Sequence, residues 1–227
     1  MFLAVINESK TMPEASVQPA VRACAAQLKL HVAPAWDMVP ASIVYYADKR
    51  QIPAGADILT ILDSADQAGL LGYHRVTPDG KPYSRVFVNP IMNHGGEFLT
   101  GSISVSAVMS HEVCEWFVDR FLNLWADGPK GAYAVEICDP VDEDFYTLDR
   151  VSVSNFVFKR FFDSLAPAGT QLDYMKKVHK PFTPTAGGQI QVRSSGKVDT
   201  IGGEAIPEWR QSMRGFEAAR SVRRRGR

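Results

Sequence analysis

Apolar residues follow two different periods in the first part of the chain. One series recurs at the spacing of a helix face: Val17, Val21, Ala25 and Leu28. Pro13 stands where such a helix would begin, so the pattern predicts a helix over Pro13–Leu30. Three short apolar runs are typical of strands: Phe2–Ile6, Ser42–Tyr46 and Ile58–Leu62. This mixture predicts a domain built from both helices and strands.

A hairpin and a second helix are predicted next. The turn residues Pro78-Asp79-Gly80-Lys81 separate Tyr73–Thr77 from Tyr83–Asn89, which predicts two paired strands. An apolar stripe at helical spacing then follows: Val105, Met109, Val113, Trp116 and Phe117. The stripe predicts a helix with one face in the core. After it, Tyr133–Cys138 is typical of a strand, whereas Val151–Phe162 fits a strand or a helix equally well.

The composition changes beyond about Pro181, where Gly, Ser, Thr and Pro dominate and only short β-like pieces occur. The chain then ends in a basic cluster: Arg220, Arg223, Arg224, Arg225 and Arg227. We therefore predict an α+β domain over residues 1–180. A β-like extension with a basic C-terminal arm is predicted over residues 181–227.

The overall composition is that of a soluble globular protein. The 227 residues are 45% hydrophobic and 22% charged, and the formal net charge is zero. Zero net charge gives no global electrostatic reason to expect a nucleic-acid partner. Three cysteines argue against a disulfide framework. The N-terminal residues lack the basic start and the cleavage site expected of a signal peptide, and no apolar run approaches the roughly 18 residues of a membrane span.

The second predicted helix contains the run Ser110-His111-Glu112-Val113-Cys114-Glu115-Trp116. It differs at Glu115 from the His-Glu-x-x-His signature of zinc metallopeptidases, in which two histidines bind the metal and the glutamate handles a proton of bound water. His111 and Glu115 lie about 40° apart around the helix. We expect both as metal ligands, with Glu112 as the general base if the site is catalytic.

A third ligand is needed, and Asp119 is a poor candidate. It lies two turns beyond His111, about 12 Å along the axis, and a single ion cannot reach both on a continuous helix. Asp119 is therefore expected to end the helix or to support a ligand. Glu136 and Asp139 are better placed, because both lie in the acidic segment after the predicted strand. Both remain candidates.

The Ser-His-Glu-x-x-Glu helix, followed by Glu136-Ile137-Cys138-Asp139, resembles zincin-like proteins of bacteria and bacteriophages. The resemblance covers roughly residues 55–160 and implies a small mixed sheet packed on an active-site helix. It also implies an edge strand beside that helix at Gly72-Tyr73-His74. His74 itself is taken as a structural or surface histidine, like His94.

The ligand set at Glu115 changes the expected chemistry. One imidazole and two carboxylates are harder and more anionic ligands than two histidines and one glutamate, so the metal is a weaker Lewis acid. Zn²⁺ is the expected ion, and Mn²⁺ or Ca²⁺ are alternatives because oxygen ligands dominate.

Two functions follow from these observations. The first is a zincin-like module that serves as a structural component of a larger assembly, such as a bacteriophage particle, in the cytoplasm or the virion. The change at Glu115, the Pro/Gly-rich extension and the basic arm favour it. The alternative is an active metal-dependent hydrolase, which the intact His111-Glu112 pair favours. The arm Arg220–Arg227 is expected to be a solvated tail or to bind an anionic partner.

Overall fold

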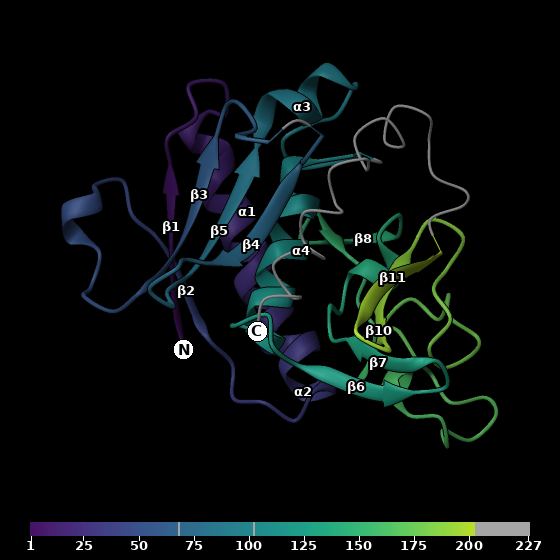
Figure 1. The fold of residues 1–227 in the computed structure, drawn as a ribbon. Coiled ribbons are helices and arrows are strands. Elements are labelled where there is room, and N and C mark those ends of the chain that lie inside the picture. Colours follow the sequence, from purple (N-terminus) through teal and green to yellow (C-terminus); the bar gives the residue numbers. More distant parts are fainter. Residues whose placement is uncertain (68, 102, 203–227) are drawn as a thin grey trace.

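The largest sheet of the protein has five strands in the order β2-β1-β3-β5-β4 (Figure 1). The structure is a computed structural model that describes residues 1–67, 69–101 and 103–202. The strands are β1 (Phe2–Asn7), β2 (Ser42–Tyr45), β3 (Asp57–Leu62), β4 (Gly72–Val76) and β5 (Pro82–Phe87). The first, second, third and fifth run parallel, and β4 pairs antiparallel with β5 at one edge. All the strands predicted in this part of the chain are confirmed.

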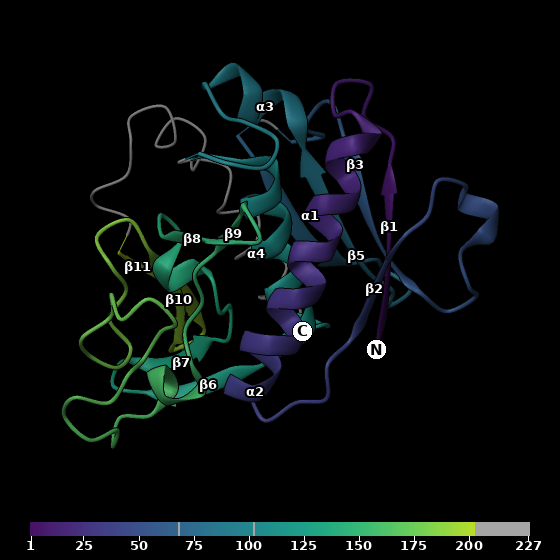
Figure 2. The same cartoon turned by 180° about the vertical axis from the view of Figure 1, so that it is seen from behind.

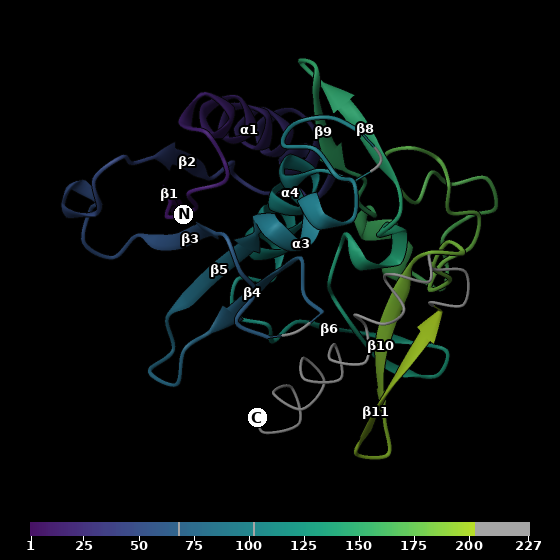
Figure 3. The ribbon, with the colours of Figure 1, turned by 90° about the horizontal axis from the view of Figure 1, so that it is seen from above.

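Two helices cover one face of this sheet (Figures 2 and 3). Helix α1 (Glu14–Gln27) connects β1 to the parallel β2 and continues through a π-helical turn (Leu28–Val32) into the short α2 (Ala33–Ala35). Helix α4 (Val105–Val118) lies beside α1 against β4 and β5. Both long helices were predicted within a few residues.

Two short helical segments complete this half of the fold. A 3₁₀ turn (Lys49–Gln51) lies between β2 and β3, and α3 (Val88–Asn93) follows β5. The strand predicted over Tyr83–Asn89 therefore ends at Phe87, where the chain turns directly into α3.

The second half of the chain forms two smaller antiparallel sheets. One has the order β11-β10-β7-β6 and the other is the hairpin β8-β9. Their bounds are β6 (Trp125–Gly128), β7 (Gly131–Ala134), β8 (Phe145–Leu148), β9 (Val151–Ser154), β10 (Gln189–Ser194) and β11 (Lys197–Gly202). Because β10 pairs with β7, residues beyond 181 share a sheet with residues before it. The chain is therefore a mixed α+β protein.

Two predictions in this half need correction or completion. The strand predicted over Tyr133–Cys138 ends at Ala134, and the next residues have no regular structure before a 3₁₀ turn at Asp139–Val141. The segment Val151–Phe162 divides into strand β9 and a 3₁₀ turn at Lys159–Phe162. The basic arm, Arg220–Arg227, lies outside the described residues. Within the described residues, no helix has both the length and the apolar character that a membrane crossing requires.

Helix α4 is buried on both sides. The large sheet covers one side, and strand β9 packs against the other, where Ser106 Oγ donates a hydrogen bond to the carbonyl oxygen of Ser152 (2.8 Å). As a result, every residue from Met109 to Val118 is buried, including the charged ones. The helix therefore places its polar residues inside the protein as well as its apolar stripe.

Asp57, at the start of β3, fixes the C-terminal end of α4 against the sheet. Its carboxylate accepts hydrogen bonds from Trp116 Nε1 (2.8 Å) and from Arg120 Nε and Nη2 (2.5 and 2.8 Å). Asp57 is 5% exposed, so these hydrogen bonds replace the contacts with water that its carboxylate has lost.

We expect Asp57→Ala to lower the free energy of unfolding by about 2–3 kcal/mol, because the substitution leaves the Arg120 charge and the indole N–H without their acceptor. Urea denaturation followed by circular dichroism measures the effect. Asp48→Ala is the control, since Asp48 pairs with the exposed Arg50 and caps a short 3₁₀ turn at the surface, and its removal should shift the midpoint less than Asp57→Ala does. Equal midpoints for Asp57→Ala and the wild type would contradict the assigned role.

Candidate metal centre

His111 and Glu115 lie one helical turn apart on α4 and face each other inside the protein. Ser104 caps the helix, its Oγ accepting a hydrogen bond from the Ala107 N–H (3.1 Å). His111 Nε2 lies 3.2 Å from Glu115 Oε1, and the two residues are 8% and 0% exposed. The geometry of the helix therefore brings together the two ligands expected from the motif.

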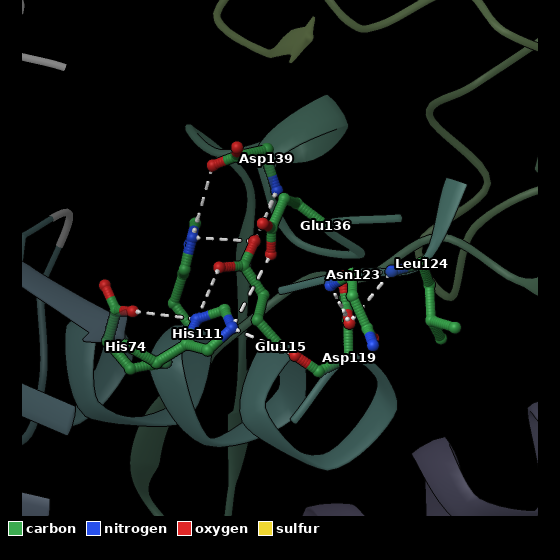
Figure 4. Close-up of polar contacts among 9 residues, drawn as sticks. His74, His111, Glu115, Asp119, Asn123, Leu124, Glu136 and Asp139 are labelled. Carbon is green, nitrogen blue, oxygen red and sulfur yellow. Dashed lines mark hydrogen bonds and ion pairs between the residues drawn. The ribbon is translucent and has the colours of Figure 1, made fainter. Parts of the chain in front are cut away.

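Asp139 joins this pair (Figure 4). Its Oδ1 lies 3.5 Å from His111 Nε2, and its backbone N–H donates to Glu115 Oε1 (3.3 Å). The irregular path after Ala134, rather than a strand, carries the chain over α4 and places the 3₁₀ turn above the two helix residues. On the other side of the imidazole, Asp142 Oδ1 lies 3.4 Å from His111 Nδ1 and orients the ring.

Glu136, the other candidate for the third ligand, lies near a different histidine, His74. Its Oε2 is 3.9 Å from Nε2 of His74, on edge strand β4. The expected alternation of Glu136 and Cys138 along a strand was therefore wrong, because no strand forms there. Cys138 is buried and, like Cys24 and Cys114, it is a free thiol.

His74 is the residue that the sequence reasoning missed. Its Nδ1 lies 3.8 Å from Glu112 Oε2 and 3.7 Å from Glu115 Oε2. Among the residues that the structure describes, two buried groups have ligand atoms within 4.8 Å of one another: His111, Glu115 and Asp139, and His74, Glu112 and Glu115. Glu115 belongs to both groups.

Gly72 explains how β4 comes so close to α4. A Cβ atom at Gly72 would lie 2.8 Å from Val108 Cγ1 and 3.0 Å from Glu112 Oε1. A side chain at this position would therefore push the edge strand away from the helix and from Glu112. Gly72 and His74 lie on the same face of the strand, two residues apart. That alternation, next to a predicted helix, is the sequence feature that could have identified His74.

The charges of these buried groups act on one another. Burial raises the pKa of Glu115 to about 7, and the nearby carboxylates of Asp139 and Glu136 add to this effect while His111 opposes it. Burial lowers the pKa of His111, but the charge of Glu115 and the hydrogen bond with Asp139 outweigh it and raise the pKa well above its usual value. For His74 too, burial lowers the pKa and the charge of Glu136 and its neighbours reverses the direction. The cluster therefore favours added positive charge.

Asp119 ends α4, as the helix spacing predicted, and supports the site from there. Its carboxylate accepts hydrogen bonds from the backbone N–H groups of Asn123 (2.9 Å) and Leu124 (3.1 Å). Its carbonyl oxygen lies 3.3 Å from His74 Nε2 and orients that ring. His94, by contrast, is exposed, and its Nδ1 contacts the carbonyl oxygen of Pro90 (2.6 Å).

No protein-family model, curated protein or solved structure matches the chain. The functional argument therefore depends on the residues and their geometry.

Ser110, the residue before His111, holds α4 against strand β9. Its Oγ accepts a hydrogen bond from the Ser154 N–H (2.6 Å) and donates one to the carbonyl oxygen of Ala107 (3.0 Å). We expect Ser110→Ala to lower the free energy of unfolding by about 1–3 kcal/mol, because a buried N–H loses its acceptor. Thermal or urea denaturation tests this. Ser164→Ala, at an exposed position, is the control and should match the wild type, and an equally stable Ser110→Ala would refute the anchoring role.

Proposed function

We propose that this chain is a zincin-like, metal-stabilised module that serves as a structural component of a larger assembly. His111, Glu115 and Asp139 would hold one divalent ion. The observation that carries the proposal is the spacing of their ligand atoms, with His111 Nε2 3.2 Å from Glu115 Oε1 and 3.5 Å from Asp139 Oδ1. Ligands about 2.0–2.2 Å from a shared tetrahedral ion lie roughly 3.3–3.6 Å from one another.

The ion would join two parts of the chain that are distant in sequence. Two of its ligands come from α4 and the third from the 3₁₀ turn Asp139–Val141, more than twenty residues later. It would also neutralise carboxylates that burial holds away from water. Zn²⁺ is the proposed ion, and Mn²⁺ or Ca²⁺ are alternatives because two of the three ligands are carboxylates.

The chemistry of the ligands supports a structural role. Carboxylates donate negative charge to the ion and make it a weaker Lewis acid than an ion held by two histidines, so bound water is harder to deprotonate. The three ligands are at most 8% exposed, which suits a closed site. The antiparallel edge strand β4 beside α4 supports the zincin-like relation, and a bacteriophage particle is the assembly that we propose.

A metal-dependent hydrolase is the second candidate, and the position of Glu112 favours it. Glu112 follows His111 on α4 and belongs, with His74 and Glu115, to one of the two groups of closely spaced ligand atoms. In this function Glu112 would accept the proton of a water molecule that the ion activates.

Metal binding should stabilise the folded protein measurably. At a free Zn²⁺ concentration about 100-fold above Kd, binding contributes about 2.7 kcal/mol, which corresponds to a rise in Tm of roughly 5–10 °C for a chain of this size. Differential scanning fluorimetry after chelation and re-addition of Zn²⁺ measures the rise. His111→Ala should reduce it, whereas His179→Ala, at an exposed position, should retain it in full. A wild-type Tm that does not respond to Zn²⁺, Mn²⁺ or Ca²⁺ would overturn the proposal.

The two candidate functions differ in whether the protein cleaves a peptide substrate. As a structural module, the metal-loaded protein should leave unstructured protein substrates such as casein intact. Cleavage that disappears in Glu112→Gln while the metal content stays unchanged would establish the hydrolase instead. Mass spectrometry of the casein fragments, with metal content measured on the same samples, makes the comparison.

A further inference from the structure

The geometry points to a second metal ion in the same cluster, held by His74, Glu112 and Glu115, so that the Glu115 carboxylate bridges two ions. This inference rests on the proposed function, because the first ion occupies the group of His111, Glu115 and Asp139. It extends that function from a single ion to a carboxylate-bridged pair.

The two oxygens of Glu115 face the two groups separately. Oε1 lies 3.2 Å from His111 Nε2 and accepts the backbone N–H of Asp139 (3.3 Å). Oε2 lies 3.7 Å from His74 Nδ1, on the side of edge strand β4. One carboxylate therefore points at two imidazoles in opposite groups, as a bridging ligand does.

The tautomer of His74 follows from its other contacts. Its Nε2 lies 3.3 Å from the carbonyl oxygen of Asp119, which can only accept a hydrogen bond, so Nε2 carries the hydrogen. In the neutral ring the lone pair of Nδ1 then points at the carboxylates of Glu112 and Glu115. A metal-binding histidine is oriented in this way, with one ring nitrogen donating to an oxygen and the other turned to the ion.

The spacing around His74 Nδ1 is too long for hydrogen bonds. Its distances to Glu112 Oε2 and Glu115 Oε2 are 3.8 and 3.7 Å, whereas a charge-assisted N–H···O bond measures about 2.7–2.9 Å. Among the described residues, His74 Nδ1 and Glu115 Oε2 are buried and have no hydrogen-bond partner. These residues are 2% and 0% exposed. An ion at the point that these atoms surround would satisfy both of them.

Charge supports a second ion as well. The buried carboxylates that face the two histidines are Glu112, Glu115, Glu136, Asp139 and Asp142. When ionised they carry five negative charges, against which one divalent ion supplies two positive charges and two ions supply four. Burial makes that difference costly, because charges in a low-dielectric interior interact strongly.

A bridging role also accounts for Glu115 in place of histidine. Histidine at this position of the helix offers one ring nitrogen to one ion, whereas a carboxylate offers an oxygen to each of two. The substitution Glu115→His, which would create the complete His-Glu-x-x-His sequence, should therefore reduce the number of bound ions from two to one.

Metal content per chain tests the inference. The protein is loaded with Zn²⁺, freed of excess ion by gel filtration, and measured by inductively coupled plasma mass spectrometry. We expect about two ions in the wild type and in the control His179→Ala. About one ion is expected in His74→Ala and in Glu115→His, with circular dichroism confirming that each variant is folded.

The outcomes separate the two proposals. One ion in the wild type, kept in His74→Ala and lost in His111→Ala, would overturn the second site and leave the proposed function intact. No ion in the wild type would overturn both. A single ion that His74→Ala removes and His111→Ala retains would overturn the proposed site at His111 and the bridged pair.

A measurement on the wild type alone avoids any dependence on how the variants fold. Mn²⁺ ions bridged by one carboxylate couple magnetically, so the electron paramagnetic resonance spectrum of the fully loaded protein should lose the hyperfine pattern of isolated Mn²⁺. Retention of that pattern at full loading would refute the bridged pair.

Discussion

The burial of ionisable side chains on α4 is the constraint on which the rest of the structure depends. A helix with His111, Glu112 and Glu115 would ordinarily turn these residues to water, but here the large sheet and strand β9 cover opposite sides of it. Each charge taken out of water must be matched by another group nearby. The surrounding elements meet this requirement. Strand β4 supplies an imidazole, and the segment after β7 supplies further carboxylates that lie close to the two histidines.

The position of the helix is fixed by polar contacts at both of its covered sides. Asp57 binds the C-terminal end of α4 to β3, and Ser110 binds its middle to β9. These contacts lie on either side of the ligand residues. They hold α4 in a defined position between the layers, so the scaffold itself sets the 3.2–3.8 Å spacings among the candidate ligand atoms.

Periodicity in the sequence predicted the elements but not their tertiary contacts. The strands of the large sheet and both long helices follow from local patterns, because apolar residues recur with the period of the element they form. Asp139 was a candidate from its position in an acidic segment. The choice between it and Glu136 depended on where the chain leaves β7, and it leaves at Ala134 to pass over α4. Alternation along the sequence cannot predict where the strand ends. The path after Ala134 is stabilised by the hydrogen bond from the Asp139 N–H to Glu115, which lies in a distant part of the chain.

His74 was missed for a related reason. The hairpin that contains it was predicted, and so was the edge strand beside the active-site helix. Alternation shows that Gly72 and His74 share a face, but not that this face meets α4 rather than solvent. Gly72 allows this face of the strand to pack against α4, because only a residue without a Cβ lets the strand approach Val108 and Glu112 so closely. The spacing of Gly72 and His74 therefore identifies His74 as a candidate ligand only when the packing of β4 against α4 is known as well.

Glu115 sets the chemistry of the proposed metal site. A carboxylate in place of the second histidine would weaken each bound ion as a Lewis acid, which argues against efficient hydrolysis by a single ion. The same carboxylate can bridge, and two ions held close together can act jointly on one substrate oxygen. In that arrangement Glu112 would bind an ion instead of accepting a proton, so the glutamate of the motif would no longer be available as the general base. The proposed pair of ions therefore favours a role in holding β4, α4 and the segment after β7 together. If hydrolysis occurs at such a site, it must proceed by the chemistry of two ions, without the proton transfer that the motif suggests.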